Sequence, residues 1–140
     1  MFLFDDLMAR GAANAPVRVG LIGAGKFGSM FLSQVPTTPG LTVSVIADLN
    51  PDHAKRACAT VGWSPELIAK TSFVDNAVAM MQAGGVDVVV EATGTPVAGI
   101  IHGRAAIENG IHIVMVNVEA DVLAGAQLAS EASAAGVVYS

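Results

Sequence analysis

VRVGLIGAGKFG, at residues 17–28, predicts the fold of this chain. Its first half is a β-branched run of strand length, and its second half is a Gly-x-Gly-x-x-Gly loop that leads into a helical pattern. In this setting Gly23 permits a tight turn, Gly25 lets the backbone approach a pyrophosphate, and Gly28 lets the helix lie close to the strand. A plain strand-to-helix turn is the alternative. The candidate phosphate-binding residues are Gly23, Ala24, Gly25, Lys26, Phe27 and Gly28.

Strand and helix patterns alternate along the rest of the chain. Further strands are expected at residues 41–47, 71–74, 86–92, 111–117 and 137–139, and helices at 26–34, 51–61, 75–83, 96–109 and 119–135. A short helix in the leading segment, residues 1–15, precedes the first strand. Short connections and near-continuous apolar strands are typical of a parallel sheet covered on both faces. We therefore predict a three-layer, doubly wound α/β fold of the Rossmann type, with strand order 3-2-1-4-5-6 and a dinucleotide-binding domain at 16–140.

The composition restricts the class of protein. The chain has 140 residues, of which 53% are hydrophobic and 14% are charged, so it can bury a core without disulfides. No apolar run approaches the roughly 18 residues of a membrane span, so we expect no membrane partner. The net charge of −5 disfavours a nucleic-acid partner, because phosphate backbones are bound by basic surfaces.

Cysteine, histidine and the chain ends add further expectations. The one cysteine, Cys58, excludes a disulfide framework, and the three histidines lie on different predicted elements, so we expect no metal site. The acidic start does not resemble a signal peptide, which makes a cytoplasmic location the default. The chain ends in a strand-like pattern, so we expect an excised domain whose substrate domain lies outside it.

Asp48 is the candidate ribose-binding residue. It ends the second predicted strand, at the spacing from the glycine loop that suits an acid on the adenosine ribose. An acid there repels a 2′-phosphate, which favours NAD over NADP. Lys55 and Arg56 in the next helix keep NADP open, and a helix-cap role for Asp48 is the alternative. Leu49, which follows Asp48, is counted with the site.

Two more motifs follow the fourth and fifth strands. The run EATGTP, residues 91–96, lies at the carboxyl end of the fourth strand, beside the point where ligands bind in such sheets. Its candidate contacts are Ala92, Thr93, Gly94, Thr95 and Pro96, with Thr93 and Gly94 expected along the nicotinamide. Glu91 is a charge on a buried strand, which is costly without a partner, and the alternative is that its side chain reaches solvent at the strand tip or caps a helix.

After the fifth strand, Asn117 is a candidate for hydrogen bonds to the nicotinamide ribose or carboxamide. Glu119 is also counted with the cofactor site. Glu119 and Asp121 fall in the first turn of the next helix, however, where the helix dipole favours acids whatever their function.

The glycine loop, EATGTP and VNVEAD at residues 116–121 together carry a family resemblance. The chain resembles homoserine dehydrogenase-type oxidoreductases, and within them the SAF-domain-containing and deoxyxylulose-phosphate reductoisomerase-like proteins of isoprenoid synthesis. The resemblance implies a cofactor-binding domain of an NAD(P)-dependent oxidoreductase. It further implies NADPH, a small-molecule substrate held by a following domain, catalytic residues in that domain, and a homo-oligomer.

Two other classes of function stay open at this point. A non-enzymatic nucleotide-sensing regulatory domain has a similar length and the same loop, with an acid after the second strand. A methyltransferase that uses S-adenosylmethionine also places an acid there, but its glycine turn is looser. The EATGTP run favours the dehydrogenase over the sensor, and the third glycine of the loop favours it over the methyltransferase.

Overall fold

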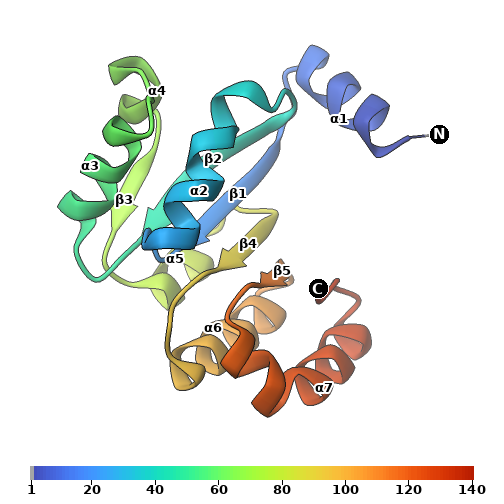
Figure 1. Ribbon diagram of the computed structural model, residues 1–140. Coiled ribbons are helices and arrows are strands. Elements are labelled where there is room, and N and C mark those ends of the chain that lie inside the picture. The colour runs from blue at the N-terminus through green and yellow to red at the C-terminus, as the bar shows by residue number, and fades with distance from the viewer. Residues whose placement is uncertain (1) are drawn as a thin grey trace.

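The computed structural model describes residues 2–140, in which helices and strands alternate as predicted (Figure 1). The strands are β1 (Val17–Ile22), β2 (Leu41–Ala47), β3 (Ser72–Val74), β4 (Val88–Glu91) and β5 (His112–Met115). The helices are α1 (Leu3–Ala12), α2 (Lys26–Gln34), α3 (Pro51–Thr60), α4 (Pro65–Ala69), α5 (Ala77–Ala83), α6 (Pro96–Glu108) and α7 (Val118–Ala135), with a 3-10 turn, η1 (Val35–Thr37), after α2.

The five strands form one parallel sheet in the order β3-β2-β1-β4-β5, which confirms the doubly wound arrangement. In place of a full sixth strand, the last residues make a single parallel bridge between Tyr139 and Ile113 of β5. Two backbone hydrogen bonds join Ser140 to β5, and Val138 accepts another from Ile113. The segment thus lies beside β5, where the sixth strand is predicted, but only a short part of it pairs.

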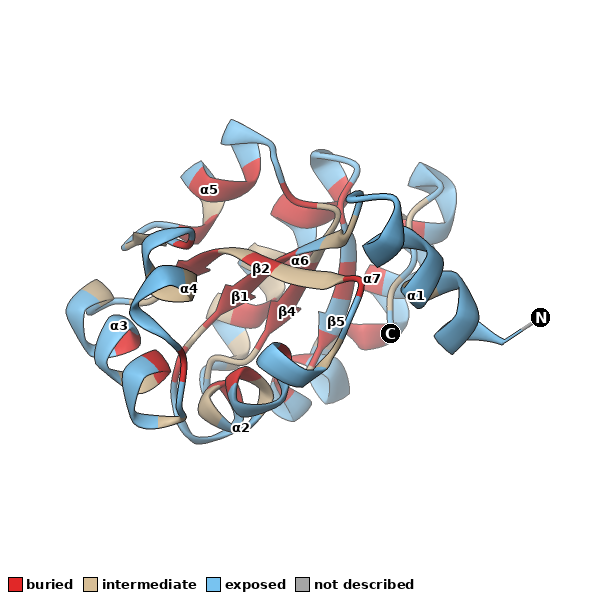
Figure 2. Cartoon of the chain, turned by 90° about the horizontal axis from the view of Figure 1, so that it is seen from above, coloured by how far each residue is buried: buried red, intermediate tan, exposed pale blue. Residues whose placement is uncertain are grey.

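Helices cover the two faces of the sheet. Buried residues of α5, α6 and α7 pack on one face, against side chains such as Val89 and Ile113. Buried residues of α2 and α3 pack on the other face with Leu21, Ile46 and Trp63. Figure 2 shows the buried residues concentrated along the central strands between these layers. The apolar composition is therefore explained by a sheet that is covered on both sides.

Several helix starts follow from capping residues. The Asn50 side chain accepts a hydrogen bond from the backbone N–H of His53 at 3.0 Å, which confirms its predicted cap role. Asn76 and Asn117 cap α5 and α7 in the same way, so α5 begins two residues later than predicted and α7 one residue earlier. Strand β4 begins at Val88, after two glycines with positive φ.

Close packing at the start of α2 depends on glycines. Gly23 has φ of 92°, and a Cβ there would lie 3.0 Å from the carbonyl oxygen of Ala92. A Cβ on Gly28 would collide with the carbonyl oxygen of Gly23. The structure thus shows the close approach of helix to strand that the motif predicts.

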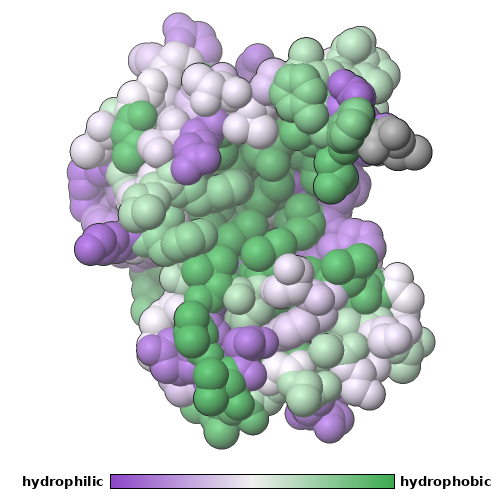
Figure 3. Space-filling model, turned by 45° about the vertical axis from the view of Figure 1, so that its right-hand side comes forward, coloured by the Kyte–Doolittle hydropathy of each residue, from purple (hydrophilic) through white to green (hydrophobic). Residues whose placement is uncertain are grey.

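The sheet is less completely covered at β5. Its side chains alternate, with Ile113 and Met115 buried toward α6 and α7, while His112 and Val114 stay exposed on the opposite face. Figure 3 shows apolar surface gathered across the middle of one side of the molecule.

Among residues 2–140, no helix combines the length and the apolar character needed to cross a membrane.

Candidate functional site

The loops that follow β1, β2, β3 and β4 meet at the carboxyl edge of the sheet and enclose a cavity of about 290 Å³. Seven of the predicted site residues line it: Gly23, Gly25, Asp48, Leu49, Ala92, Thr93 and Gly94. The structure adds five residues that the sequence analysis did not assign to the site: Ile22, Ala47, Asp75, Ala77 and His102. Small apolar side chains therefore alternate with a few polar groups around the cavity, as in many ligand sites.

The glycine loop leaves the start of α2 open. Gly25 is the N-cap residue and offers no side-chain cap, so the first N–H groups of α2 have no partner within the helix. A Cβ built on Gly25 would meet nothing within 4 Å, so open space lies in front of this backbone. The side chains of Lys26 and Phe27 are exposed, so these residues contribute their backbone N–H groups, and not their side chains, to the start of α2. This arrangement fits an anion at the start of α2.

Asp48 is held by two backbone groups. One carboxylate oxygen accepts from the N–H of Ala24 at 2.9 Å, and the other accepts from the N–H of Asn50 at 2.8 Å. These bonds fix the side chain between the glycine loop and the start of α3. A carboxylate oxygen has more than one lone pair, so both oxygens keep the capacity to accept from ribose hydroxyls.

Glu91 lies at the end of β4, behind the cavity wall. It is fully buried, which rules out the expected alternative that it reaches solvent. Its Oε1 accepts a hydrogen bond from the Thr93 hydroxyl and lies 3.0 Å from Nδ1 of His102. Thr93 and His102 both line the cavity, so Glu91 orients two of its polar groups.

Asn117 follows β5, as predicted, and its side chain is buried in contacts within the protein. It is 2% exposed, and its amide donates to the carbonyl oxygen of Thr95 at 2.7 Å and to the hydroxyl of Thr93 at 3.3 Å. Its side-chain oxygen accepts from the N–H of Ala120 as the cap of α7. Asn117 therefore anchors the loop between β4 and α6.

The remaining predicted residues lie outside the cavity lining. Thr95 and Pro96 start α6 beside the anchored loop, and Glu119 is exposed in the first turn of α7. Their sequence positions predict a place at the site because the carboxyl ends of parallel strands share one edge. Which of these residues face the cavity depends on loop paths that no motif encodes.

Asp75 and His102 are the polar residues that sequence reasoning missed. Asp75 follows β3, so the rule that ligands bind at the carboxyl ends of strands could have found it. His102 lies in the second turn of α6 and had no comparable signal, because its place depends on how α6 packs against β4. Within residues 2–140, no three His, Cys, Asp or Glu side chains converge as a metal site would require.

A glycine loop at a helix start, an acid after β2 and a cavity at the carboxyl edge of the sheet are the features of a dinucleotide site. Residues 23–140 match the family model of the homoserine dehydrogenase NAD-binding domain. The chain belongs to this family. The match includes every residue that lines the cavity except Ile22.

One curated protein is similar in sequence, and solved structures are similar in fold. A glycosyl hydrolase family 109 protein of Streptomyces coelicolor is 31% identical over 106 residues, which is 74% of this chain but 22% of that protein. A homoserine dehydrogenase from Thiobacillus denitrificans superposes with a TM-score of 0.74 at 23% identity, over 89% of this chain and 29% of its own. The WlbA dehydrogenase from Bordetella pertussis, in complex with NADH and UDP-GlcNAcA, superposes with a TM-score of 0.69 at 20% identity. This match covers 87% of this chain and 36% of the WlbA chain. The chain therefore spans between 22% and 36% of the length of these proteins.

Proposed function

We propose that this chain is the cofactor-binding domain of an NAD(P)-dependent oxidoreductase, and that Asp48 favours NAD. The observation that carries the proposal is the shared cavity of Gly25 and Asp48, because it offers a phosphate site and a ribose site side by side. Similar structures were solved with NADH and with NADP, which supports a nicotinamide dinucleotide as the ligand, and the preference for NAD rests on Asp48 alone.

Each part of the chain would hold one part of the cofactor. The backbone of the glycine loop and the open start of α2 would take the pyrophosphate. Asp48, fixed by Ala24 and Asn50, would accept the hydroxyls of the adenosine ribose. When bound, a nicotinamide dinucleotide supplies hydride transfer, and the protein supplies position and electrostatics.

The reaction itself would belong to a longer protein that contains this domain. We propose that a further domain supplies the substrate site and the catalytic residues, as the resemblance implies, and that the full protein is a homo-oligomer. The reductoisomerase-like reaction in isoprenoid synthesis and the use of NADPH stay predictions from the resemblance.

Isothermal titration of the chain with NADH and with NADPH tests the proposal. We expect saturable binding of NADH and weaker binding of NADPH, because the Asp48 carboxylate repels a 2′-phosphate. In Asp48→Asn, NADH affinity should fall roughly tenfold, the effect of weakening charge-assisted hydrogen bonds, and the preference against NADPH should shrink. Asp5→Asn, which changes an exposed acid of α1, is the matched control.

The outcomes separate the parts of the proposal. If neither dinucleotide binds in a saturable way, the cofactor-binding function is wrong. If NADPH binds more tightly than NADH, the function stands and only the role given to Asp48 is wrong.

A further inference from the structure

The buried carboxylate of Glu91 is not explained by packing. Its neighbours on β4, Val89 and Val90, are apolar and buried, and Glu91 is equally buried at 0% exposure. One of its oxygens, Oε2, is buried without a hydrogen-bond partner among the described residues. Burying a carboxylate oxygen that makes no hydrogen bond costs folding free energy, so an apolar residue at this position would give a more stable strand. What Glu91 contributes must therefore come from its other oxygen.

That oxygen fixes the imidazole of His102. The Thr93 hydroxyl donates to Glu91 Oε1, so this oxygen acts as an acceptor, and the contact of 3.0 Å then assigns the donor role to Nδ1 of His102. The neutral ring then carries its lone pair on Nε2, as an acceptor. The His102 side chain is 16% exposed and lines the cavity. Glu91 thereby sets both the orientation and the hydrogen-bonding character of a cavity residue.

The position of His102 indicates which part of the cofactor it meets. In the proposed function the ribose lies on Asp48 and the pyrophosphate on the glycine loop. The rest of the same cavity is lined mostly by apolar or small residues, among them Ala77, Ala92 and Gly94. The polar side chains there are those of Asp75 after β3, Thr93 after β4 and His102 on α6. A largely apolar space next to the ribose site suits the purine base, and this assignment places Thr93 and Gly94 beside the base, whereas the sequence predicts them along the nicotinamide. The Thr93 hydroxyl uses its hydrogen in the bond to Glu91. On the α6 side of the cavity, the side-chain atom that remains as a hydrogen-bond acceptor is Nε2 of His102.

We propose that Glu91 and His102 form a base-reading pair, in which His102 Nε2 accepts a hydrogen bond from the exocyclic amino group of adenine. Glu91 acts as the positioning residue. The inference rests on the proposed function and adds a base specificity to it. A 6-oxopurine carries an oxygen where adenine carries the amino group, and two acceptors facing one another repel. The chain should therefore discriminate adenine from hypoxanthine dinucleotides.

The test compares NADH with reduced nicotinamide hypoxanthine dinucleotide by isothermal titration. We expect the unaltered chain to prefer NADH by about tenfold, the effect of one hydrogen bond to an unpaired site. His102→Phe should bind the two dinucleotides equally. Glu91→Leu, which frees the imidazole, should also lose the preference, whereas Glu91→Gln keeps a side-chain oxygen as acceptor and should restore most of it.

His112→Phe is the matched control, because His112 is an exposed histidine at the amino end of β5, away from the cavity. It should keep the tenfold preference. Circular dichroism and thermal unfolding establish that each variant is folded, and His102→Leu replaces His102→Phe if the larger ring prevents folding.

Nitrogen NMR of the imidazoles gives a readout that needs no variant of the site. The chain has three histidines, so the His102 signals can be assigned. We expect a ring protonated at Nδ1, and an Nε2 resonance that moves when NADH is added but stays in place with reduced nicotinamide mononucleotide, which lacks adenine.

Three results would overturn the base-reading pair while leaving the proposed function intact. They are no preference for adenine in the unaltered chain, an unchanged preference in a folded His102 variant, and an Nε2 resonance that NADH does not move. Absence of NADH binding to the unaltered chain would instead overturn the proposed function, and the base-reading pair with it.

Discussion

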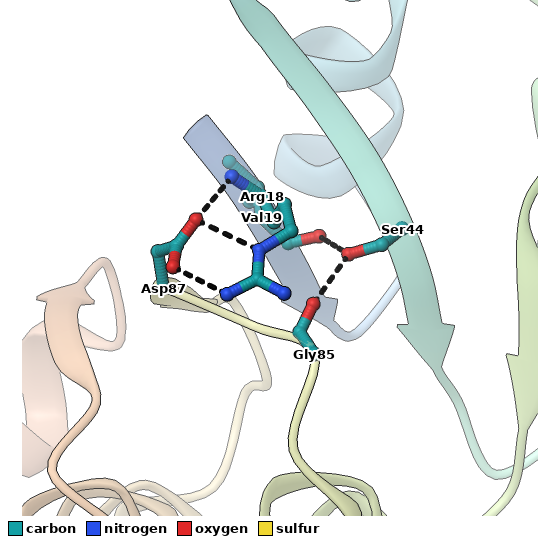
Figure 4. Close-up of polar contacts among 5 residues, drawn as sticks. All are labelled: Arg18, Val19, Ser44, Gly85 and Asp87. Carbon is teal, nitrogen blue, oxygen red and sulfur yellow. Dashed lines mark hydrogen bonds and ion pairs between the residues drawn. The ribbon is translucent and has the colours of Figure 1, made fainter. Parts of the chain in front are cut away.

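The ion pair between Arg18 and Asp87 joins the amino ends of β1 and β4, and we predict that its removal weakens the fold in a pH-dependent way. The guanidinium of Arg18 donates to both carboxylate oxygens of Asp87, at 2.8 and 3.1 Å, and the backbone N–H of Arg18 donates to the same carboxylate at 2.8 Å (Figure 4). Beside it, the Ser44 hydroxyl bridges the carbonyl oxygens of Val19 and Gly85. The perturbation is Asp87→Asn, which keeps the shape and removes the charge.

The magnitude follows from the pKa of Asp87. Hydrogen bonds from the Arg18 side chain lower this pKa from 3.8 to about 2. At 1.36 kcal/mol per unit, this shift corresponds to at most about 2.4 kcal/mol of folding free energy. The Asp87 and Arg18 side chains are 34% and 49% exposed, so solvent screening reduces the expected value to about 1 kcal/mol.

The sign of the pH dependence is fixed by the direction of the shift. Because the folded-state pKa is depressed, the contribution is complete above the unfolded-state pKa near 4 and is lost as the pH falls toward 2. Urea unfolding should show Asp87→Asn less stable by about 1 kcal/mol at pH 7, and by roughly half as much at pH 3. Asp5→Asn should change neither value. A difference between the unaltered chain and Asp87→Asn that is the same at pH 7 and pH 3, or absent at pH 7, would refute this reasoning.

Three further outcomes follow from the structure. Gly25→Ala should leave the urea midpoint unchanged but abolish measurable NADH binding by titration. Gly28→Ala should instead destabilise the fold by about 1–3 kcal/mol, because its Cβ meets the Gly23 carbonyl. Equal loss of stability in the two variants would contradict the distinction. Burial raises the pKa of the Cys58 thiol to about 11, so a colorimetric disulfide reagent at pH 8 should react slowly with the folded chain and rapidly in urea, and rapid reaction without urea would be inconsistent with this. Asn117→Ala removes the cap of α7 and the anchor of the β4–α6 loop, so unfolding in urea should show a loss of about 1–2 kcal/mol or more, and an unchanged midpoint would count against the anchor role.

Local chemistry made much of the fold predictable. The glycine loop, the apolar strands and the cap of α3 by Asn50 are short-range features. The order of the parallel strands across the sheet follows from right-handed crossovers. The predicted boundaries differ from the structure by one or two residues where a capping side chain or a glycine pair decides the end. The sixth strand was predicted from three apolar residues, and strand length depends on a partner that a local pattern does not describe.

The site was less predictable than the fold. Gly25 and Asp48 were predicted because motif and spacing place them at the carboxyl edge of adjacent strands, and both line the cavity. Asn117 belongs to a motif of the same kind, yet it is turned toward the loop that it anchors. His102 belongs to no motif, and it lines the cavity.

The sequence by itself determined the alternation of strands and helices, the open glycine loop and the acid after the second strand, because each depends on residues close together in the chain. Only the tertiary structure decided that Glu91 is buried and that it holds His102 from another element. Burial, and the pairing of a carboxylate with an imidazole eleven positions away, arise from the packing of α6 on β4. Packing involves contacts across the whole chain, and these contacts determine which polar groups face the cavity.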